Sequence, residues 1–136
     1  MPRARTVLCV DEYQALLDTM APVLQPFGFE VWTASSLEQA YELTAAHQPD
    51  AVLLEYRMCP ACPARGGACL AGQIHALSPA TKILVWCADG RAMQELPPCA
   101  HAVFMKPLAP ADLADHLDEV LDPTSPVSRN PSPAQR

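Results

Sequence analysis

Charged side chains follow three of the apolar, strand-like runs of this sequence. In chain order they are Asp11 with Glu12, then Glu55, and finally Lys106 followed by Pro107. Three carboxylates brought together suit a hard divalent cation such as Mg2+, which prefers oxygen ligands, and the lysine ammonium would balance one of the negative charges. The alternative is that acids at strand ends are solvated or cap the next helix. Which chemistry applies depends on whether the fold brings these strand ends to one place.

Four of the six cysteines form a second set with chemical potential. They are Cys59, Cys62, Cys69 and Cys87. Four thiolates are a possible tetrahedral site for Zn2+ or ligands of an iron-sulfur cluster. A redox dithiol at Cys59 and Cys62 is a further option. Cys9 and Cys99 lie apart from this set and are expected to be small buried apolar residues.

Five short apolar runs alternate with stretches of helical periodicity. The strand-like runs are 6–10, 30–34, 51–54, 82–86 and 102–105, and the helical stretches are 16–24, 37–44, 70–77, 90–96 and 112–121. Ser35 or Ser36 is expected to cap the second helix, and Asp112 to cap or open the last one. Parallel neighbours need a crossover helix, so the alternation predicts an α/β fold: a doubly wound, flavodoxin-like sheet of five parallel strands in a three-layer sandwich. The carboxyl ends of such strands meet in one crevice, where we expect the charged residues and Cys87.

The length of 136 residues predicts one domain over residues 6–122, with a short arm at 1–5 and a flexible Pro- and Ser-rich tail at 123–136. The net charge is -6, and all 15 acidic residues lie between Asp11 and Asp122. Such an acidic surface disfavours nucleic acid. No apolar run approaches the roughly 18 residues of a membrane span, and no export signal is recognised, so a cytoplasmic location without membrane contact is expected. No glycine-rich phosphate loop or nucleophile motif is found, and an enzyme is not expected.

The sequence resembles the receiver domain of two-component response regulators over about residues 6–122. The matching motifs are Val10-Asp11-Glu12, the run from Pro49 to Met58, and Phe104-Met105-Lys106-Pro107. In that family an acid pair helps to hold Mg2+, and an aspartate after the third strand accepts a phosphoryl group from a histidine kinase. A Ser or Thr after the fourth strand and a lysine after the fifth contact the phosphate. The resemblance implies that Asp11 and Glu12 are the acid pair, that Glu55 stands at the acceptor position, and that Lys106 is the lysine.

Three departures from the family pattern bear on function. Glu55 is one methylene longer than aspartate, and a displacement of about an ångström can slow phosphoryl transfer on the order of 100-fold. Cys87, a weak hydrogen-bond donor, stands in place of the Ser or Thr. Val103 stands where the family often has a switching Phe or Tyr, and Phe104 should face the other side of its strand.

These departures predict a pseudo-receiver that acts in a phosphorelay through protein–protein contacts without phosphorylation. The long Glu55 carboxylate would imitate part of the charge of a phosphoryl group beside Lys106. The expected partner is a histidine kinase or another signalling protein. Two alternatives stay open: a metal or redox sensor built on the cysteine loop, and a receiver in which Glu55 is slowly phosphorylated.

Overall fold

The structure, a computed structural model, describes residues 5–55, 70–87, 100–105 and 109–122. The described elements, in chain order, are β1 (Arg5–Val10), α1 (Gln14–Leu24), the 3-10 turn η1 (Gln25–Phe27), β2 (Phe29–Ala34), α2 (Leu37–His47), β3 (Ala51–Glu55), α4 (Leu70–Leu77), β4 (Lys82–Cys87), β5 (Ala102–Met105) and α6 (Pro110–Leu121). Among these helices none has the length and apolar character that a bilayer crossing requires. The expected helix at 90–96, the arm at residues 1–4 and the tail at 123–136 lie outside the described residues.

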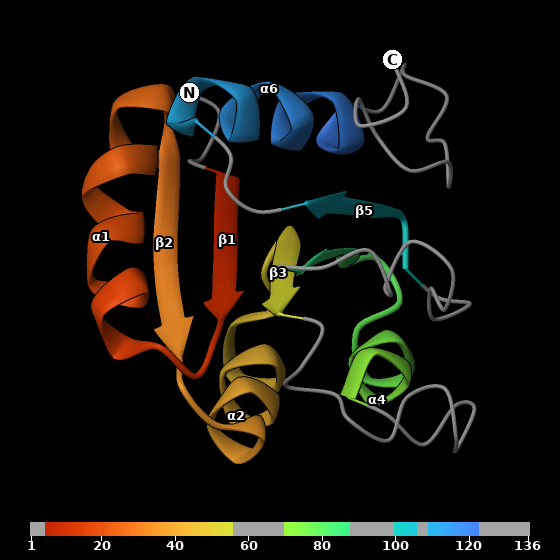
Figure 1. Cartoon of the computed structure of the whole chain (residues 1–136). Helices are drawn as coiled ribbons and strands as arrows, with labels where there is room; N and C mark the ends of the chain where they lie inside the picture. The colour runs from red at the N-terminus through yellow and green to blue at the C-terminus, as the bar shows by residue number, and fades with distance from the viewer. Residues whose placement is uncertain (1–4, 56–69, 88–99, 106–108, 123–136) are drawn as a thin grey trace.

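All five strands are parallel and lie in one sheet with the order β2-β1-β3-β4-β5. Figure 1 shows α1 and α6 on one side of the sheet and α2 and α4 on the other. Parallel neighbours need a crossover connection, and α1, α2 and α4 lie in the crossovers from β1 to β2, from β2 to β3 and from β3 to β4. The predicted doubly wound, flavodoxin-like fold is confirmed.

The core has two layers because successive residues of each strand point to opposite faces. Beneath α2 and α4, the strands contribute Leu8, Val10, Val52, Leu54, Ile83, Val85 and Val103. Beneath α1 and α6, they contribute Val7, Cys9, Ala51, Leu53, Leu84, Trp86, Ala102 and Phe104. Burial on both faces explains why the strands are almost uninterrupted apolar runs rather than alternating ones.

Side-chain and backbone caps fix the ends of the helices before and after β2. The Ser36 hydroxyl accepts a hydrogen bond of 3.1 Å from the backbone N–H of Gln39, and the Ser35 N–H donates to the Gln39 side-chain oxygen at 3.0 Å. The predicted serine cap of α2 is therefore confirmed at Ser36. Gly28 ends η1 in the left-handed region at φ 95°, a conformation that glycine adopts without steric cost.

The last helix begins earlier than the sequence predicts. Asp112 is not its cap: α6 starts at Pro110, with Ala109 as the N-cap residue and no capping side chain, and Asp112 lies within the first turn. Proline suits the first helical position because its fixed φ is already helical and its missing N–H would have had no partner there. Asp112 still favours the helix, because a carboxylate in the first turn complements the helix dipole.

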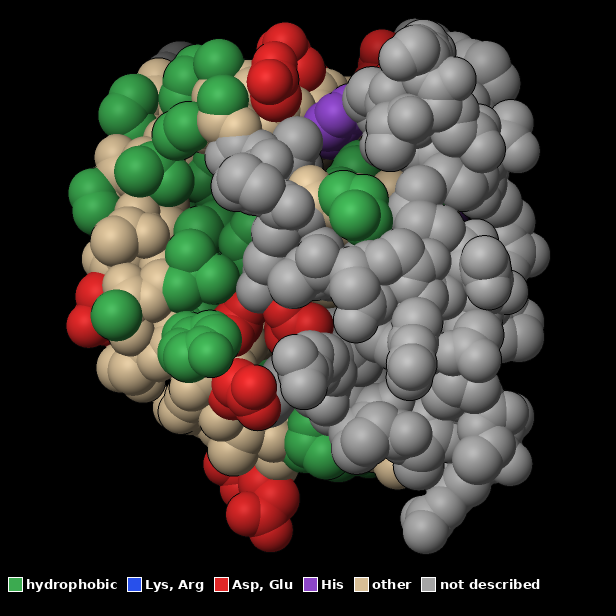
Figure 2. Space-filling model, in the orientation of Figure 1, with side chains coloured by type: hydrophobic (Ala, Val, Ile, Leu, Met, Phe, Trp, Pro, Cys, Tyr) green, Lys and Arg blue, Asp and Glu red, His purple; other side chains and the backbone are tan. Residues whose placement is uncertain are grey.

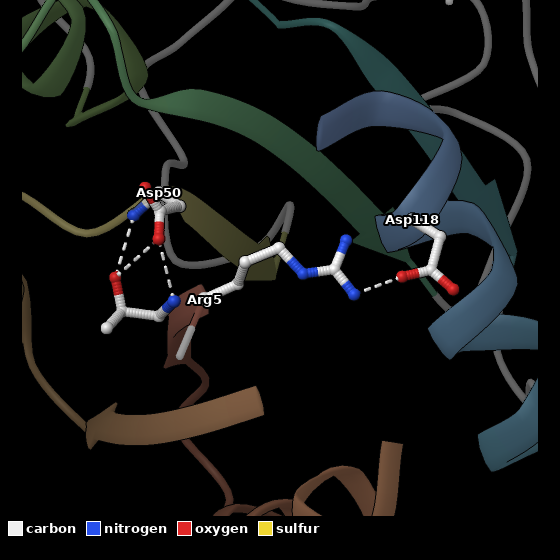
Figure 3. A network of polar contacts seen from close by, with 4 residues as sticks. Arg5, Asp50 and Asp118 are labelled. Atoms are coloured by element: carbon white, nitrogen blue, oxygen red, sulfur yellow. Dashed lines mark hydrogen bonds and ion pairs between the residues drawn. The ribbon is translucent and has the colours of Figure 1, made fainter. Parts of the chain in front are cut away.

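A polar network ties the first strand to the third at the amino end of the sheet (Figure 3). The Asp50 carboxylate accepts from the Thr6 backbone N–H at 2.8 Å and from the Thr6 hydroxyl at 3.2 Å, and the Asp50 N–H donates to that hydroxyl at 2.9 Å. Beside it, the Arg5 guanidinium forms an ion pair with Asp118 of α6 and lies 4.6 Å from the centre of the Phe29 ring. The candidate site lies at the other end of the sheet, at the carboxyl ends of the strands.

Candidate functional site

Two of the predicted acids meet at the carboxyl edge of the sheet. Val10 pairs with Leu54 in the register of β1 and β3. Asp11 and Glu55 each follow a member of that pair directly, so they lie side by side on neighbouring strand ends. Cys9 and Leu53, two positions earlier, pack under α1 and α6, and side-chain alternation places both acids on that same side.

The three predicted acids differ in burial. Asp11 is 0% exposed and Glu55 is 4% exposed, whereas Glu12 is exposed. One Asp11 carboxylate oxygen accepts a hydrogen bond of 2.9 Å from the backbone N–H of Tyr13, the N-cap residue of α1. This bond fixes the carboxylate where β1 turns into α1. The structure therefore brings Asp11 and Glu55 together in the interior and places Glu12 at the surface.

The donor chemistry of this pair fits a magnesium ion. Mg2+ is typically held by one or two carboxylates and keeps several of its water ligands. Asp11 and Glu55 supply two buried carboxylates at the carboxyl ends of the neighbouring strands β1 and β3. Within the described ranges, no three histidine, cysteine, aspartate or glutamate side chains form a group that could hold a metal ion.

β4 and β5 determine on which face of the sheet the residues near the carboxyl edge lie. Trp86 pairs with Glu55, and Cys87 pairs with Met105. Val103 lies in the core beneath α2 and α4, whereas Phe104 lies in the core beneath α1 and α6, as side-chain alternation predicts. The Phe104 ring stacks on His116 of α6, with ring centres 4.6 Å apart. This aromatic ring is thus fixed on the other side of the sheet from Val103.

Several predicted site residues lie outside what the structure describes. Lys106 and Pro107 follow the last described residue of β5, and Cys59, Cys62 and Cys69 belong to the segment 56–69. Cys87 is described only as the final residue of β4, and its side chain is not. The geometry of the lysine and of the cysteine set therefore stays a prediction.

Cys9 is a free cysteine, and it lies in mid-strand at 0% exposure. Burial, and to a lesser extent the negative charge of Asp11, raise the pKa of its thiol to about 12. A thiol with such a pKa is protonated at neutral pH and is neither a nucleophile nor a metal ligand. The expectation that Cys9 is a buried apolar residue is confirmed.

Sequence reasoning missed two features. Asp50 was recognised only as part of a motif, although its carboxylate joins the amino ends of β1 and β3. Leu37 and Tyr41 belong to the helical stretch expected at 37–44, where periodicity groups them with the residues that face the sheet, but each is 43% exposed. The sequence did contain a signal for this exposure. Leu37 and Tyr41 lie four residues apart on one face of the helix and the smaller Ala40 lies on another, and a surface helix buries only one face.

The fold and its acidic edge define a protein of the receiver class, and the comparison with known families agrees. The chain belongs to the response regulator receiver domain family, whose model matches residues 7–118. It is thus a receiver domain of the two-component response-regulator type.

The chain is also similar to individual proteins, and the solved structures among them share its fold. The chain is 28% identical over 127 residues to the phosphate regulon transcriptional regulatory protein PhoB of Pseudomonas aeruginosa, an alignment covering 90% of this chain and 54% of that protein. This chain therefore spans about half the length of that relative. Among solved structures, the CheY-like receiver domain protein of Methanospirillum hungatei is 24% identical with a TM-score of 0.74, covering 88% of this chain and 94% of that one. A response regulator of Thermotoga maritima is 20% identical, also with a TM-score of 0.74, covering 87% and 98%.

Proposed function

We propose that this receiver domain acts in two-component signalling as a phosphorylation-independent interaction module. The observation that carries the proposal is the glutamate at the end of β3. Glu55 is buried at the end of the strand next to β1, which Asp11 follows. The resemblance of the sequence to the family implies that Glu55 stands where receivers have their phosphoacceptor aspartate. A carboxyl group there occupies, without any phosphoryl transfer, the corner of the fold that phosphorylation would otherwise change.

The length of the glutamate side chain opposes phosphoryl transfer. Catalysis of that transfer depends on in-line positioning and on electrostatic stabilisation, with little covalent chemistry from the protein. An extra methylene displaces the nucleophilic oxygen by roughly an ångström, which costs on the order of 100-fold in rate. Cys87 in place of the family's hydroxyl residue adds a second loss, because a thiol donates only weakly to a phosphate oxygen.

Protein contact is the output that the surface supports. Tyr13, the N-cap residue of α1, is 67% exposed, and Phe27, the last residue of η1, is 43% exposed. Figure 2 shows hydrophobic side chains gathered over α1. Exposed aromatic groups of this kind are typical of protein-binding surfaces. We propose a histidine kinase or another signalling protein as the partner, with no enzymatic reaction by this domain.

Nucleic acid does not fit the same surface. The described ranges contain Arg5 and Lys82 as their only lysine or arginine residues. Arg5 is already paired with Asp118. A phosphate backbone would meet predominantly negative charge.

The test is intact-mass spectrometry after incubation with acetyl phosphate and Mg2+. The wild-type chain is expected to gain no phosphoryl mass, and Glu55→Gln should behave in the same way. Glu55→Asp restores the acceptor length and is expected to gain one phosphoryl group, so it serves as the positive control. A mass gain in the wild type that is lost in Glu55→Gln would instead establish the slow phosphoacceptor.

A further inference from the structure

A groove runs between α2 and α4, on the opposite side of the sheet from α1 and α6. Its volume is about 730 Å³, within the range of binding sites in proteins. The lining residues are Leu37, Glu38, Tyr41 and Glu42 of α2 with Gln73, Ala76 and Leu77 of α4. No residue of the acidic edge takes part, so the groove is separate from the phosphoacceptor position.

The apolar residues of this groove are not used by the core. α2 buries Ala40 and Thr44 against the sheet, while Leu37 and Tyr41 are each 43% exposed. A helix selected only for packing would bury its large side chains and expose its small ones. Leu37 and Tyr41 are four residues apart and therefore lie on one side of the helix, which makes a continuous apolar strip.

Negative charge borders the strip. Glu38 and Glu42 are also four residues apart, which separates them by about 6 Å along the helix axis. Neither carboxylate has an ion-pair partner in the part of the chain that the structure describes, and α2 and α4 contain no lysine or arginine. An apolar strip with a single sign of charge along it selects its occupant by charge.

We propose that this groove binds a basic amphipathic helix of a partner protein. Its apolar side chains would enter the groove beside Leu37 and Tyr41, and two lysines or arginines four residues apart would pair with Glu38 and Glu42. The matching rise of about 6 Å on both helices allows the two pairs to form together. A neutral or acidic helix would desolvate the same two carboxylates without compensation.

The probe is a fluorescent helical peptide of about 18 residues, long enough to hold helical structure. One face carries leucines, and lysines at i and i+4 flank them. A matched peptide has glutamate in place of each lysine. Binding to the full 136-residue chain is followed by anisotropy, and the contact site by amide shifts in NMR spectra. The lysine peptide is expected to bind saturably below about 1 mM, with shifts on α2 and α4 and weaker binding at higher salt.

Surface variants decide whether the groove is responsible. The double reversal Glu38→Lys with Glu42→Lys should weaken binding by about tenfold or more, because two favourable pairs become repulsive. The matched control is Asp115→Lys with Glu119→Lys, an exposed acid pair with the same spacing on α6 and the same change in net charge. That control should stay within about twofold of the wild type.

The proposal would be overturned by no saturable binding, by equal binding of the glutamate peptide, by equal loss in the two double reversals, or by amide shifts confined to α1 and α6. Self-association of the chain that the Glu38 and Glu42 reversals abolish would identify a second copy as the occupant and would also overturn it. None of these readouts involves Glu55, so the result is independent of the phosphorylation test.

Discussion

Removing the Asp50 carboxylate should destabilise the domain by an amount that its hydrogen bonds predict. Asp50→Ala removes the acceptor of the Thr6 backbone N–H, a bond of 2.8 Å whose donor residue is only 8% exposed. A hydrogen bond to a charged group contributes about 1.5–3 kcal/mol, and a buried donor left without a partner costs about 1–3 kcal/mol. The Thr6 hydroxyl still receives the N–H of residue 50, so that part of the network survives. We expect a loss of about 2–3 kcal/mol in the free energy of unfolding.

The assay is urea denaturation of the full chain, followed by circular dichroism at constant pH. Asp50→Asn keeps an oxygen acceptor but loses the charge, and should cost about 1 kcal/mol. Asp18→Ala is the matched control. Asp18 lies exposed on α1 and accepts a single side-chain bond from Gln14, so its loss should stay within about 0.5 kcal/mol. An Asp50→Ala variant as stable as Asp18→Ala would refute the role assigned to this network.

The remaining predictions concern the buried thiol, a turn and the cysteine set. The pKa of Cys9 is raised from 9.0 to about 12, so the unfolded chain ionises first as the pH rises. The thiol therefore destabilises the fold by roughly 1.4 kcal/mol per pH unit above pH 9. The free energy of unfolding of Cys9→Val relative to wild type, measured in EDTA, should rise as the pH increases above 9 and should not change with pH near 7. The same difference between the two proteins at both pH values would contradict the prediction. Gly28→Ala should cost about 1 kcal/mol by urea denaturation, because φ is 95° although an added Cβ would meet nothing within 4 Å; an unchanged midpoint would count against the strain. If the cysteine loop holds zinc, elemental analysis of protein purified without added metal should give about one equivalent, lost in Cys62→Ser; no zinc in the wild type would remove the metal alternative.

The architecture was predictable because its signals are local and repeated. Apolar runs such as residues 6–10 and 51–54 cannot pair in parallel without a crossover, so their alternation with helical stretches determines the class of fold. The meeting of Asp11 with Glu55 followed from the same rule, since parallel strands end at one edge. Sequence alone could not assign their burial, because Glu12 is adjacent to Asp11 and equally acidic but points outward.

The less predictable features depend on tertiary contacts. Helical periodicity groups Leu37 and Tyr41 with Ala40, and only the packing of α2 on the sheet shows that the small residue is buried and the large ones are exposed. The start of α6 at Pro110 was missed because aspartate favours both the cap and the first turn of a helix. The link between Thr6 and Asp50 joins residues 44 positions apart, and no local pattern encodes it.

The central claim, that the Glu55 position does not switch the domain, is tested most directly with beryllium fluoride, which mimics a phosphoryl group on an acceptor carboxylate. Amide NMR spectra of the wild-type chain would be recorded with Mg2+, before and after its addition, beside those of Glu55→Asp. The wild type should keep its spectrum through β4 and β5, while the aspartate variant shows shifts at the carboxyl edge. Broad shifts of residues 82–87 and 102–105 in the wild type would contradict the claim, because they would show a receiver that still responds to phosphoryl chemistry.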